Sequence, residues 1–135
     1  MAGTWGISAD LSKISDHQQS VILSEIQNYR RLSPIKPACL YELRQATDGA
    51  DVAGVTFYDA RRKRAAVLLY RWDRNGAFDQ QIAVDRLRRS SSYQITDADT
   101  GIITTTSGAE LLGNGVTIPF GADRLSALLF IEPSN

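Results

Sequence analysis

The chain is poor in the side chains from which metal sites and many active sites are built. It holds a single cysteine, Cys39, and a single histidine, His17, among 135 residues. One cysteine excludes an intrachain disulfide, and the shortage of both residue types leaves His17 without partners for a zinc site or a catalytic triad. We interpret His17 as a solvated residue at the start of a helix, and we expect no metal and no cofactor.

Net charge and long apolar runs are also lacking. Fifteen basic and fifteen acidic side chains cancel, so the chain has no net basic field to attract nucleic acid or a membrane surface. The sequence contains no run of about eighteen apolar residues and no N-terminal signal pattern. These features predict a soluble, cytoplasmic domain with no nucleic-acid partner and no membrane partner.

One helix is predicted, and it begins at Ser15. Ser15 and Gln18 have the spacing of a capping box, in which each side chain satisfies a free backbone N–H of the first turn. Pro34 ends the helix, because the residue before a proline is pushed out of the helical region. Between these points an apolar stripe follows helical spacing at Ile22, Ile26 and Tyr29. Val21 and Leu23 widen the stripe, and so broad an apolar surface indicates two packing partners.

The chain from Lys36 onward is predicted to form short strands separated by turns. Its apolar runs recur about every eight to twelve residues, which is the spacing of an antiparallel sandwich or barrel. These runs cover residues 39–43, 52–58, 65–72, 78–84, 92–96, 102–106, 110–112, 116–120 and 125–132. Asn75–Gly76 and Gly113–Gly115 predict tight hairpin turns. The predicted fold class is mainly β: an antiparallel β-sandwich of about eight strands preceded by one α-helix.

The remaining motifs contain no catalytic set. Asp97 and Asp99 lack the further oxygen ligands of a calcium loop, and we interpret them as turn aspartates that bond their own backbone. The serines at 90–92 lack the G-x-S-x-G pattern of a nucleophile elbow. None of the fifteen carboxylates ends a strand of a parallel barrel, where a glycoside hydrolase would need a facing pair. The sequence predicts no catalytic, cofactor-binding or metal-binding residue in this chain.

Aromatic side chains are the candidates for contact with carbohydrate. Tyr58, Tyr70 and Trp72 would form a stacking platform if their rings faced solvent and were roughly coplanar. Tyr70 and Trp72 fall on one face of an apolar strand, so burial in the core is the competing interpretation.

Three segments, within residues 3–15, 26–43 and 107–132, resemble melibiase-type α-galactosidases, which are glycoside hydrolase family thirty-six. Residues 3–15, Gly-Thr-Trp-Gly-Ile-Ser-Ala-Asp-Leu-Ser-Lys-Ile-Ser, resemble the family's G-x-x-G-y-x-x-D-L-x-x-L-S stretch. Residues 26–35 with 40–43 resemble its I-x-x-Y-K-x-L-R-P-x-I and L-Y-x-L motifs. Residues 107–112, 118–120 and 126–132 resemble its closing S-G-x-E-L, apolar-Pro-apolar and S-A-x-L-x-x-x-E motifs. The ordered set covers nearly the whole chain.

The resemblance implies a C-terminal region of such an enzyme, and the opening of the chain has the character of the middle of a longer sequence. Residues 1–35 would be the remnant of the barrel end with the last barrel helix, and residues 36–135 the C-terminal antiparallel β-sandwich domain. In the family the nucleophile and the acid/base aspartate lie on earlier barrel strands, and no position here corresponds to either. Trp5, in the segment that closes the barrel, becomes a further candidate for carbohydrate contact.

Three functions remain open at this stage. The leading one is a non-catalytic accessory domain that packs on the catalytic barrel of the parent chain and touches carbohydrate weakly. The second is a free-standing carbohydrate-binding module with an exposed aromatic platform, and the third is a self-sufficient enzyme, for which we expect no turnover. In isolation, the apolar surface around Val21 to Leu23 would be exposed and is expected to favour self-association.

Overall fold

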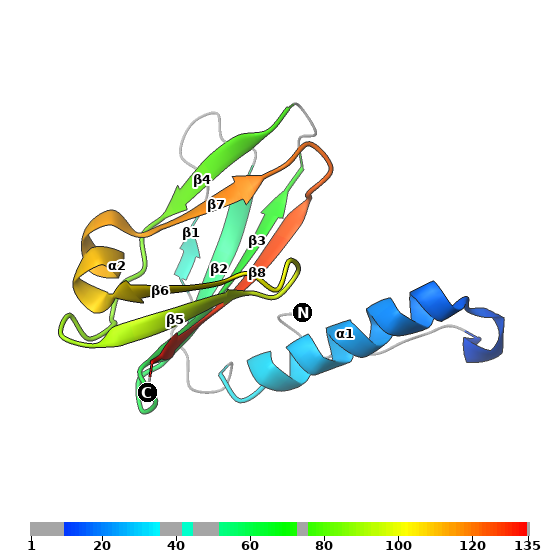
Figure 1. Cartoon of the computed structure of the whole chain (residues 1–135), viewed down its shortest axis with the longest axis horizontal. Coiled ribbons are helices and arrows are strands. Elements are labelled where there is room, and N and C mark those ends of the chain that lie inside the picture. Colours follow the sequence, from blue (N-terminus) through cyan, green and yellow to red (C-terminus); the bar gives the residue numbers. More distant parts are fainter. Residues whose placement is uncertain (1–9, 36–41, 45–51, 73–75, 135) are drawn as a thin grey trace.

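The computed structural model describes residues 10–35, 42–44, 52–72 and 76–134, and it is mostly antiparallel β structure (Figure 1). Its helices and strands, in chain order, are η1 (Leu11–Lys13), α1 (Asp16–Leu32), β1 (Glu42–Arg44), β2 (Val52–Asp59), β3 (Arg64–Arg71), β4 (Phe78–Ile82), β5 (Ser92–Asp97), β6 (Ile103–Ser107), α2 (Gly108–Asn114), β7 (Val116–Phe120) and β8 (Ser126–Pro133). The predicted mainly-β sandwich, preceded by one long helix, is confirmed.

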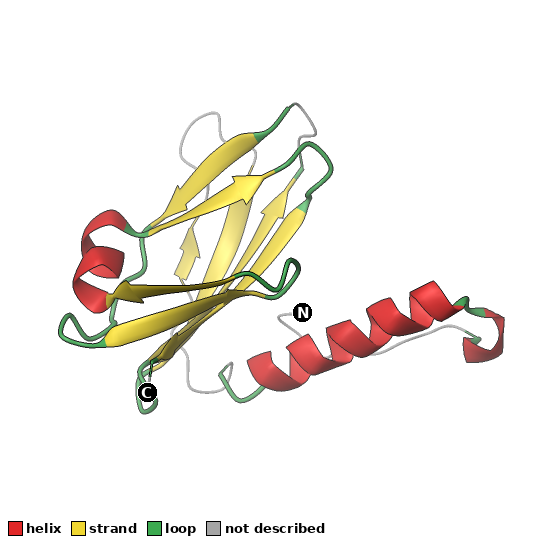
Figure 2. Ribbon diagram, viewed as in Figure 1, coloured by secondary structure: helices red, strands yellow, loops and turns green. Residues whose placement is uncertain are grey.

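Two sheets form the sandwich. The larger has the strand order β1-β2-β3-β8-β5-β6, and the smaller consists of β4 and β7. In Figure 2 the β4–β7 ribbon lies over one face of the larger sheet, while α2 closes one end. Strand β3 pairs with β2 on one side and β8 on the other, and it is buried on both faces. The apolar run at residues 65–72 therefore contains a central strand of the large sheet.

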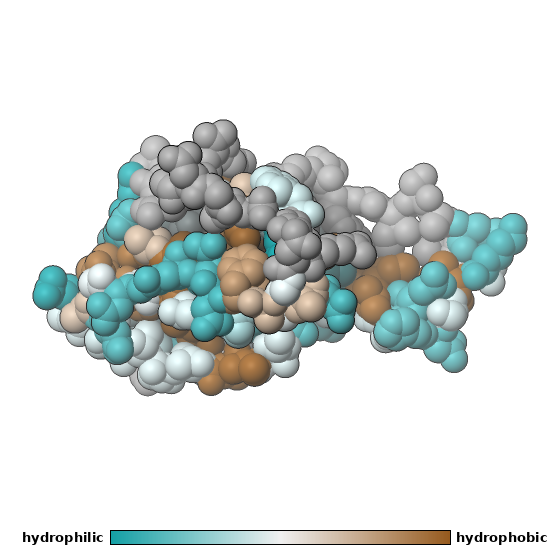
Figure 3. Space-filling view, turned by 90° about the horizontal axis from the view of Figure 1, so that it is seen from above, coloured by the Kyte–Doolittle hydropathy of each residue, from teal (hydrophilic) through white to brown (hydrophobic). Residues whose placement is uncertain are grey.

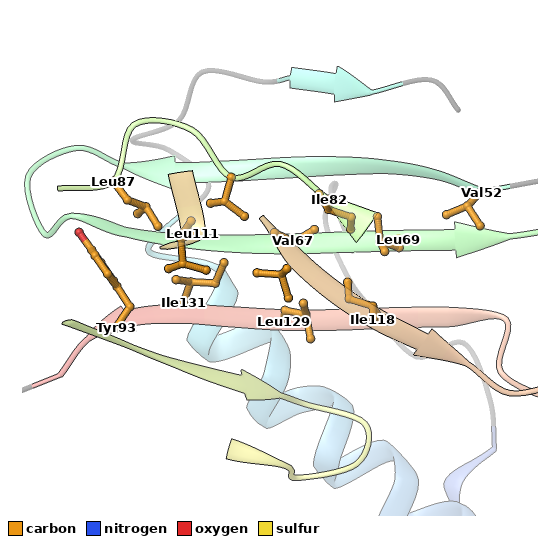
Figure 4. Packing of buried hydrophobic residues seen from close by; sticks show 14 of the residues in the cluster. Val52, Val67, Leu69, Ile82, Leu87, Tyr93, Leu111, Ile118, Leu129 and Ile131 are labelled. Carbon is orange, nitrogen blue, oxygen red and sulfur yellow. The ribbon is translucent and has the colours of Figure 1, made fainter. Parts of the chain in front are cut away.

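The main core fills the space between the two sheets (Figure 4). Its members alternate along β3 and β8 and meet residues of β7 and α2 from the opposite layer. The inner cluster comprises Val52, Ala65, Val67, Leu69, Ile82, Val84, Leu87, Tyr93, Leu111, Val116, Ile118, Phe120, Ala127, Leu129 and Ile131. The Tyr93 hydroxyl, although buried, accepts a hydrogen bond from the backbone N–H of Arg88 at 2.9 Å.

A second cluster lies on the outer face of the large sheet and holds the end of α1. The outer cluster comprises Leu32, Ile35, Val55, Phe57, Ala66, Leu68, Leu128 and Phe130. Leu32 is the one buried residue of α1. The helix is therefore attached by its last turn, and Figure 1 shows the rest of it extending beyond the sheet.

The predicted helix signals are confirmed. The backbone N–H of Gln18 donates to Ser15 Oγ at 3.3 Å, and the Ser15 N–H donates to Gln18 Oε1 at 2.8 Å, which completes the capping box. The helix ends at Leu32, with Ser33 as its C-cap before Pro34. Local chemistry determines both ends of α1.

The strand predicted at 110–112 and the turn predicted at Gly113–Gly115 are wrong. Residues 108–114 form α2, because the side chain of Ser107 caps the helix by accepting the backbone N–H of Glu110 at 3.1 Å. Gly115 ends the helix with φ of +71°, a conformation that favours glycine. The same glycine that indicates a hairpin turn also serves as a helix stop, and the serine cap decides between the two.

The hairpin predicted around Asn75–Gly76 is also wrong in its pairing. Strand β3 pairs with β2 and β8, whereas β4 pairs with β7 in the other sheet; residues 73–75 lie outside the described residues. The guanidinium of buried Arg71 donates to the carbonyls of Gly76 and Gly121, at 2.7 and 3.1 Å. This link joins the connection after β3 to the end of β7, so the chain crosses between layers here.

Candidate functional site

The aspartate pair that could have held a metal has a structural role. Asp97 Oδ1 accepts the backbone N–H groups of Asp99 and Thr100, at 3.0 and 3.3 Å, which confirms the turn interpretation. Among the described residues there is no group of three or more His, Cys, Asp or Glu side chains suited to a metal ion. No helix within the described ranges is long and apolar enough to span a membrane. His17 lies exposed on the first turn of α1.

The aromatic candidates fall in different places. Tyr70 and Trp72 are exposed, by 40% and 68%, and the alternation along β3 places them on the outer face with Leu68. Tyr58 is half-buried and packs against the inner cluster, so it belongs to the opposite face. Trp5 lies outside the described residues. The competing interpretation, burial of Tyr70 and Trp72 in the core, is wrong.

Tyr70 lines a cleft between α1 and the outer face of the large sheet. The cleft has a volume of about 240 Å³, and the residues around it are Glu25, Leu68, Tyr70, Asp99, Ser126 and Leu128. Leu68 and Leu128 are buried and form an apolar floor. Sequence reasoning identified Tyr70 but missed the two carboxylates and the serine, because they come from segments far apart along the chain.

The walls of this α1 cleft are held by defined contacts. Tyr70 and Ser126 are directly paired across β3 and β8. Asp99 Oδ2 accepts a bond from Arg124 Nη2 at 3.2 Å, and the same nitrogen lies 2.8 Å from Asp97 Oδ2. Partial burial and the negative charge of Glu25 both raise the pKa of Tyr70, so its hydroxyl stays protonated and able to donate at neutral pH.

Charged and stacking contacts of Arg31 hold the last turn of α1 on the sheet. The guanidinium of Arg31 forms an ion pair with Glu132, donates to Thr96 Oγ1 at 3.3 Å, and lies 4.1 Å from the ring centroid of Phe130. Arg64 Nη1 approaches the other oxygen of Glu132 at 3.8 Å. The last turn of α1 is thus held to β5 and β8 by charge and by stacking as well as by Leu32.

In the turns of α1 that precede these contacts, apolar side chains are exposed to solvent. Val21 is 48% and Leu23 60% exposed, and brown, hydrophobic surface is visible on the projecting helix in Figure 3. Further exposed apolar side chains are those of Ile102, just before β6, and Ile103, the first residue of β6, which are 62% and 57% exposed. The broad apolar surface predicted around Val21 to Leu23 is present and lacks a buried partner within the described residues.

Comparison with known proteins gives one consistent answer at the level of fold. No protein-family model matches the chain, and no curated protein sequence matches it. Among solved structures, the GH36 α-galactosidase AgaA from Geobacillus stearothermophilus in complex with stachyose matches 93% of the chain, with a TM-score of 0.73 and 18% identity. The α-galactosidase from Lactobacillus brevis also matches 93%, with a TM-score of 0.71 and 18% identity.

A solved structure described with a different activity is also similar to this chain. A putative α-N-acetylgalactosaminidase from Bacillus halodurans matches 93% of the chain with a TM-score of 0.63 and 15% identity. The chain spans 17% of AgaA, 18% of the Lactobacillus brevis protein and 26% of the Bacillus halodurans protein. At these identities the likeness is one of fold, and the resemblance seen in the sequence motifs is confirmed: this chain has the fold of a domain-sized part of the GH36 α-galactosidases.

Proposed function

We propose that the chain is a non-catalytic C-terminal domain of an α-galactosidase-like glycoside hydrolase, which packs against the catalytic barrel and stabilises it. The observation that carries the proposal is the exposed apolar surface of α1. Val21 and Leu23 are about half exposed or more, while the one buried residue of the helix, Leu32, lies in its last turn. A surface of this kind marks a protein interface.

The helix needs such a partner for its own stability. An isolated helix of about fifteen residues is marginal in water, and most helices in proteins are stabilised by packing along an apolar face. Among the 17 residues of α1, Leu32 in the last turn is the one that is buried in the described part of the chain. A barrel packed around the preceding turns of the helix would supply the rest of the packing, while the contacts of Arg31 hold the last turn of α1 on the sheet.

The proposed parent would act on α-galactosides. Structures with this fold include α-galactosidases in complex with stachyose and with raffinose, and this chain covers about a sixth of their length. The described residues place no facing pair of carboxylates on a barrel, so the chemistry would belong to the parent's other segments. The 135-residue chain itself is expected to leave p-nitrophenyl α-galactoside unhydrolysed.

The test begins with the reading frame upstream of Gly3. Under the proposal that frame encodes several hundred further residues, roughly the remainder of a GH36 enzyme, with the periodicity of a parallel barrel. The product that contains both parts should hydrolyse p-nitrophenyl α-galactoside. A stop codon directly upstream would refute the proposal and favour a free-standing carbohydrate-binding module, for which the exposed rings of Tyr70 and Trp72 are the supporting observation.

A single substitution then tests the interface. Leu23→Glu should change the unfolding free energy of the 135-residue chain by less than about 0.5 kcal/mol, because Leu23 is exposed there. In the barrel-containing protein the same change buries an unpaired charge and should cost about 2–3 kcal/mol. Ser24→Glu is the matched control, since Ser24 is exposed and lies about 100° around α1 from Leu23. Equal effects of Leu23→Glu in both proteins would contradict the packing surface.

A further inference from the structure

We propose that the α1 cleft binds one hexose ring of a neutral sugar, with Tyr70 stacking on the ring and with Glu25, Asp99 and Ser126 bonding its hydroxyls. The cleft is a cavity of about 240 Å³ that joins an aromatic ring, two carboxylates and a serine over an apolar floor. Its volume lies just below the about 300 Å³ at which pockets for drug-sized ligands begin. It therefore suits a single ring, with any further sugar units left in solvent.

The lining matches the two kinds of surface that a sugar ring presents. The C–H groups of a pyranose form an apolar face, for which the exposed ring of Tyr70 and the Leu68–Leu128 floor are complementary. Its hydroxyls form a polar edge that donates to carboxylates in charge-assisted hydrogen bonds. Glu25 and Asp99 supply the acceptors, and the Ser126 hydroxyl can both donate and accept.

Most of the site is preformed. Ser126 and Tyr70 are opposite each other in the β3–β8 register, and Asp99 is held by Arg124 and by the hydrogen bond from its own N–H to Asp97. Glu25 comes from α1 and completes the remaining wall. Rigid walls lower the entropic cost of binding, so weak but specific affinity is expected from few contacts.

Arg124 compensates part of the negative charge around the cleft. Its guanidinium is shared between two carboxylates, because Nη2 lies 2.8 Å from Asp97 Oδ2 and 3.2 Å from Asp99 Oδ2. The side chain of Asp99 is 35% exposed, so its second oxygen can still accept a hydroxyl. A guanidinium or ammonium ion would lose its hydration over the apolar floor of the cleft, whereas a neutral sugar brings hydroxyl donors to Glu25 and Asp99 without that cost.

The experiment is a titration of the ¹⁵N-labelled 135-residue chain with methyl α-D-galactopyranoside, in which binding is monitored through the amide chemical shifts. The choice of a galactoside as the probe rests on the proposed function, whereas the assignment of the cleft as a sugar site does not. We expect saturable shifts at Glu25, Tyr70, Asp99 and Ser126 with half-saturation in the millimolar range. Because the ligand is neutral, the half-saturation concentration should change less than about twofold between 0.05 and 0.5 M NaCl.

Variants separate stacking from hydrogen bonding. Tyr70→Ala should raise the half-saturation concentration about tenfold or more, and Tyr70→Phe less than about threefold, because the ring is kept. Glu25→Gln should raise it about three- to tenfold through the loss of a charged acceptor. Trp72→Ala is the matched control, since Trp72 is an exposed ring beyond the same strand but outside the cleft. Each variant is used only if it keeps the amide dispersion of the parent chain.

Three results would overturn the assignment. The first is an absence of saturable shifts at the cleft with galactoside. The second is stronger, salt-sensitive binding of L-arginine amide at the same amides, which would identify a pocket for a basic side chain. The third is loss of sugar binding in Trp72→Ala, which would identify a flat platform instead. Packing on the barrel is tested separately by Leu23→Glu, so failure of one proposal leaves the other standing.

Discussion

Asp59 is a buried carboxylate on which the turn between β2 and β3 depends, and its replacement should cost stability in a pH-dependent way. Its exposed fraction is 1%. Oδ1 accepts the backbone N–H groups of Arg61 and Arg62, both at 3.2 Å. Oδ2 lies 3.2 Å from Nε of Arg64 and 3.5 Å from a nitrogen of Arg62. Lys63, in the same turn, has φ of +54°, so this turn carries backbone strain that the carboxylate offsets.

The expected loss of unfolding free energy follows from the burial of Asp59 and from the exposure of its two arginine partners. Breaking a fully buried ion pair costs about 3–5 kcal/mol. The Arg62 side chain is 67% exposed and can return to water, whereas the Arg64 side chain is 16% exposed. We therefore expect Asp59→Ala to lower the unfolding free energy by about 2–3 kcal/mol at pH 7. For a domain of this size that corresponds to a fall in Tm of roughly 6–12 °C.

The direction of the pH dependence of stability follows from the direction in which the pKa of Asp59 is shifted. Burial alone would raise the pKa of Asp59, but the hydrogen bonds from the Arg62 backbone and from the Arg64 and Arg62 side chains hold it below its ordinary value. A carboxyl group with a lowered pKa in the folded state stabilises the protein above its unfolded pKa of about 4. That contribution is lost as the pH falls through the folded pKa.

Urea unfolding at a series of pH values measures the loss of unfolding free energy. The variant Asp59→Asn removes the charge of Asp59 and keeps its shape. The control is Asp79→Asn, on an exposed residue of β4. Asp59→Asn should cost about 1–2 kcal/mol at pH 7, since the amide oxygen still accepts the turn N–H groups, and the difference from wild type should shrink below pH 4. The control should stay within about 0.5 kcal/mol of wild type. A difference between Asp59→Asn and wild type that is the same at pH 7 and pH 3 would refute the reasoning.

Other contacts give predictions of the same kind. Arg31→Ala removes the ion pair with Glu132 and the stacking on Phe130, so hydrogen exchange in the last turn of α1 should accelerate about tenfold while β3 is unchanged; equal acceleration in both would argue for global unfolding instead. Gly115→Ala should cost more than about 2 kcal/mol by thermal unfolding, because φ is +71° and a Cβ would lie 2.1 Å from a backbone oxygen. Gly113→Ala, with open space around it in α2, should be neutral or stabilise by up to about 1 kcal/mol. A Gly113→Ala variant as unstable as Gly115→Ala would contradict this account of α2.

The sequence by itself determined the elements whose signals are local. The limits of α1 follow from Ser15, Gln18 and Pro34, because a cap and a proline act on backbone groups within one turn. The alternation in β2 and the apolar run of β3 indicate strands for a similar reason, since each residue's face is set by its neighbours. Even the family resemblance is carried by short motifs in order along the chain.

Tertiary structure decided what depends on contacts between distant segments. Asn75–Gly76 signals a turn without specifying partners, and β4 pairs with β7 because its apolar side chains complete the layer over β3 and β8. The cleft could not be predicted, since Glu25, Tyr70 and Asp99 meet there from separate segments of the chain. Non-local packing alone brings them together, which is why the sequence indicated an aromatic candidate and the structure supplied its polar partners.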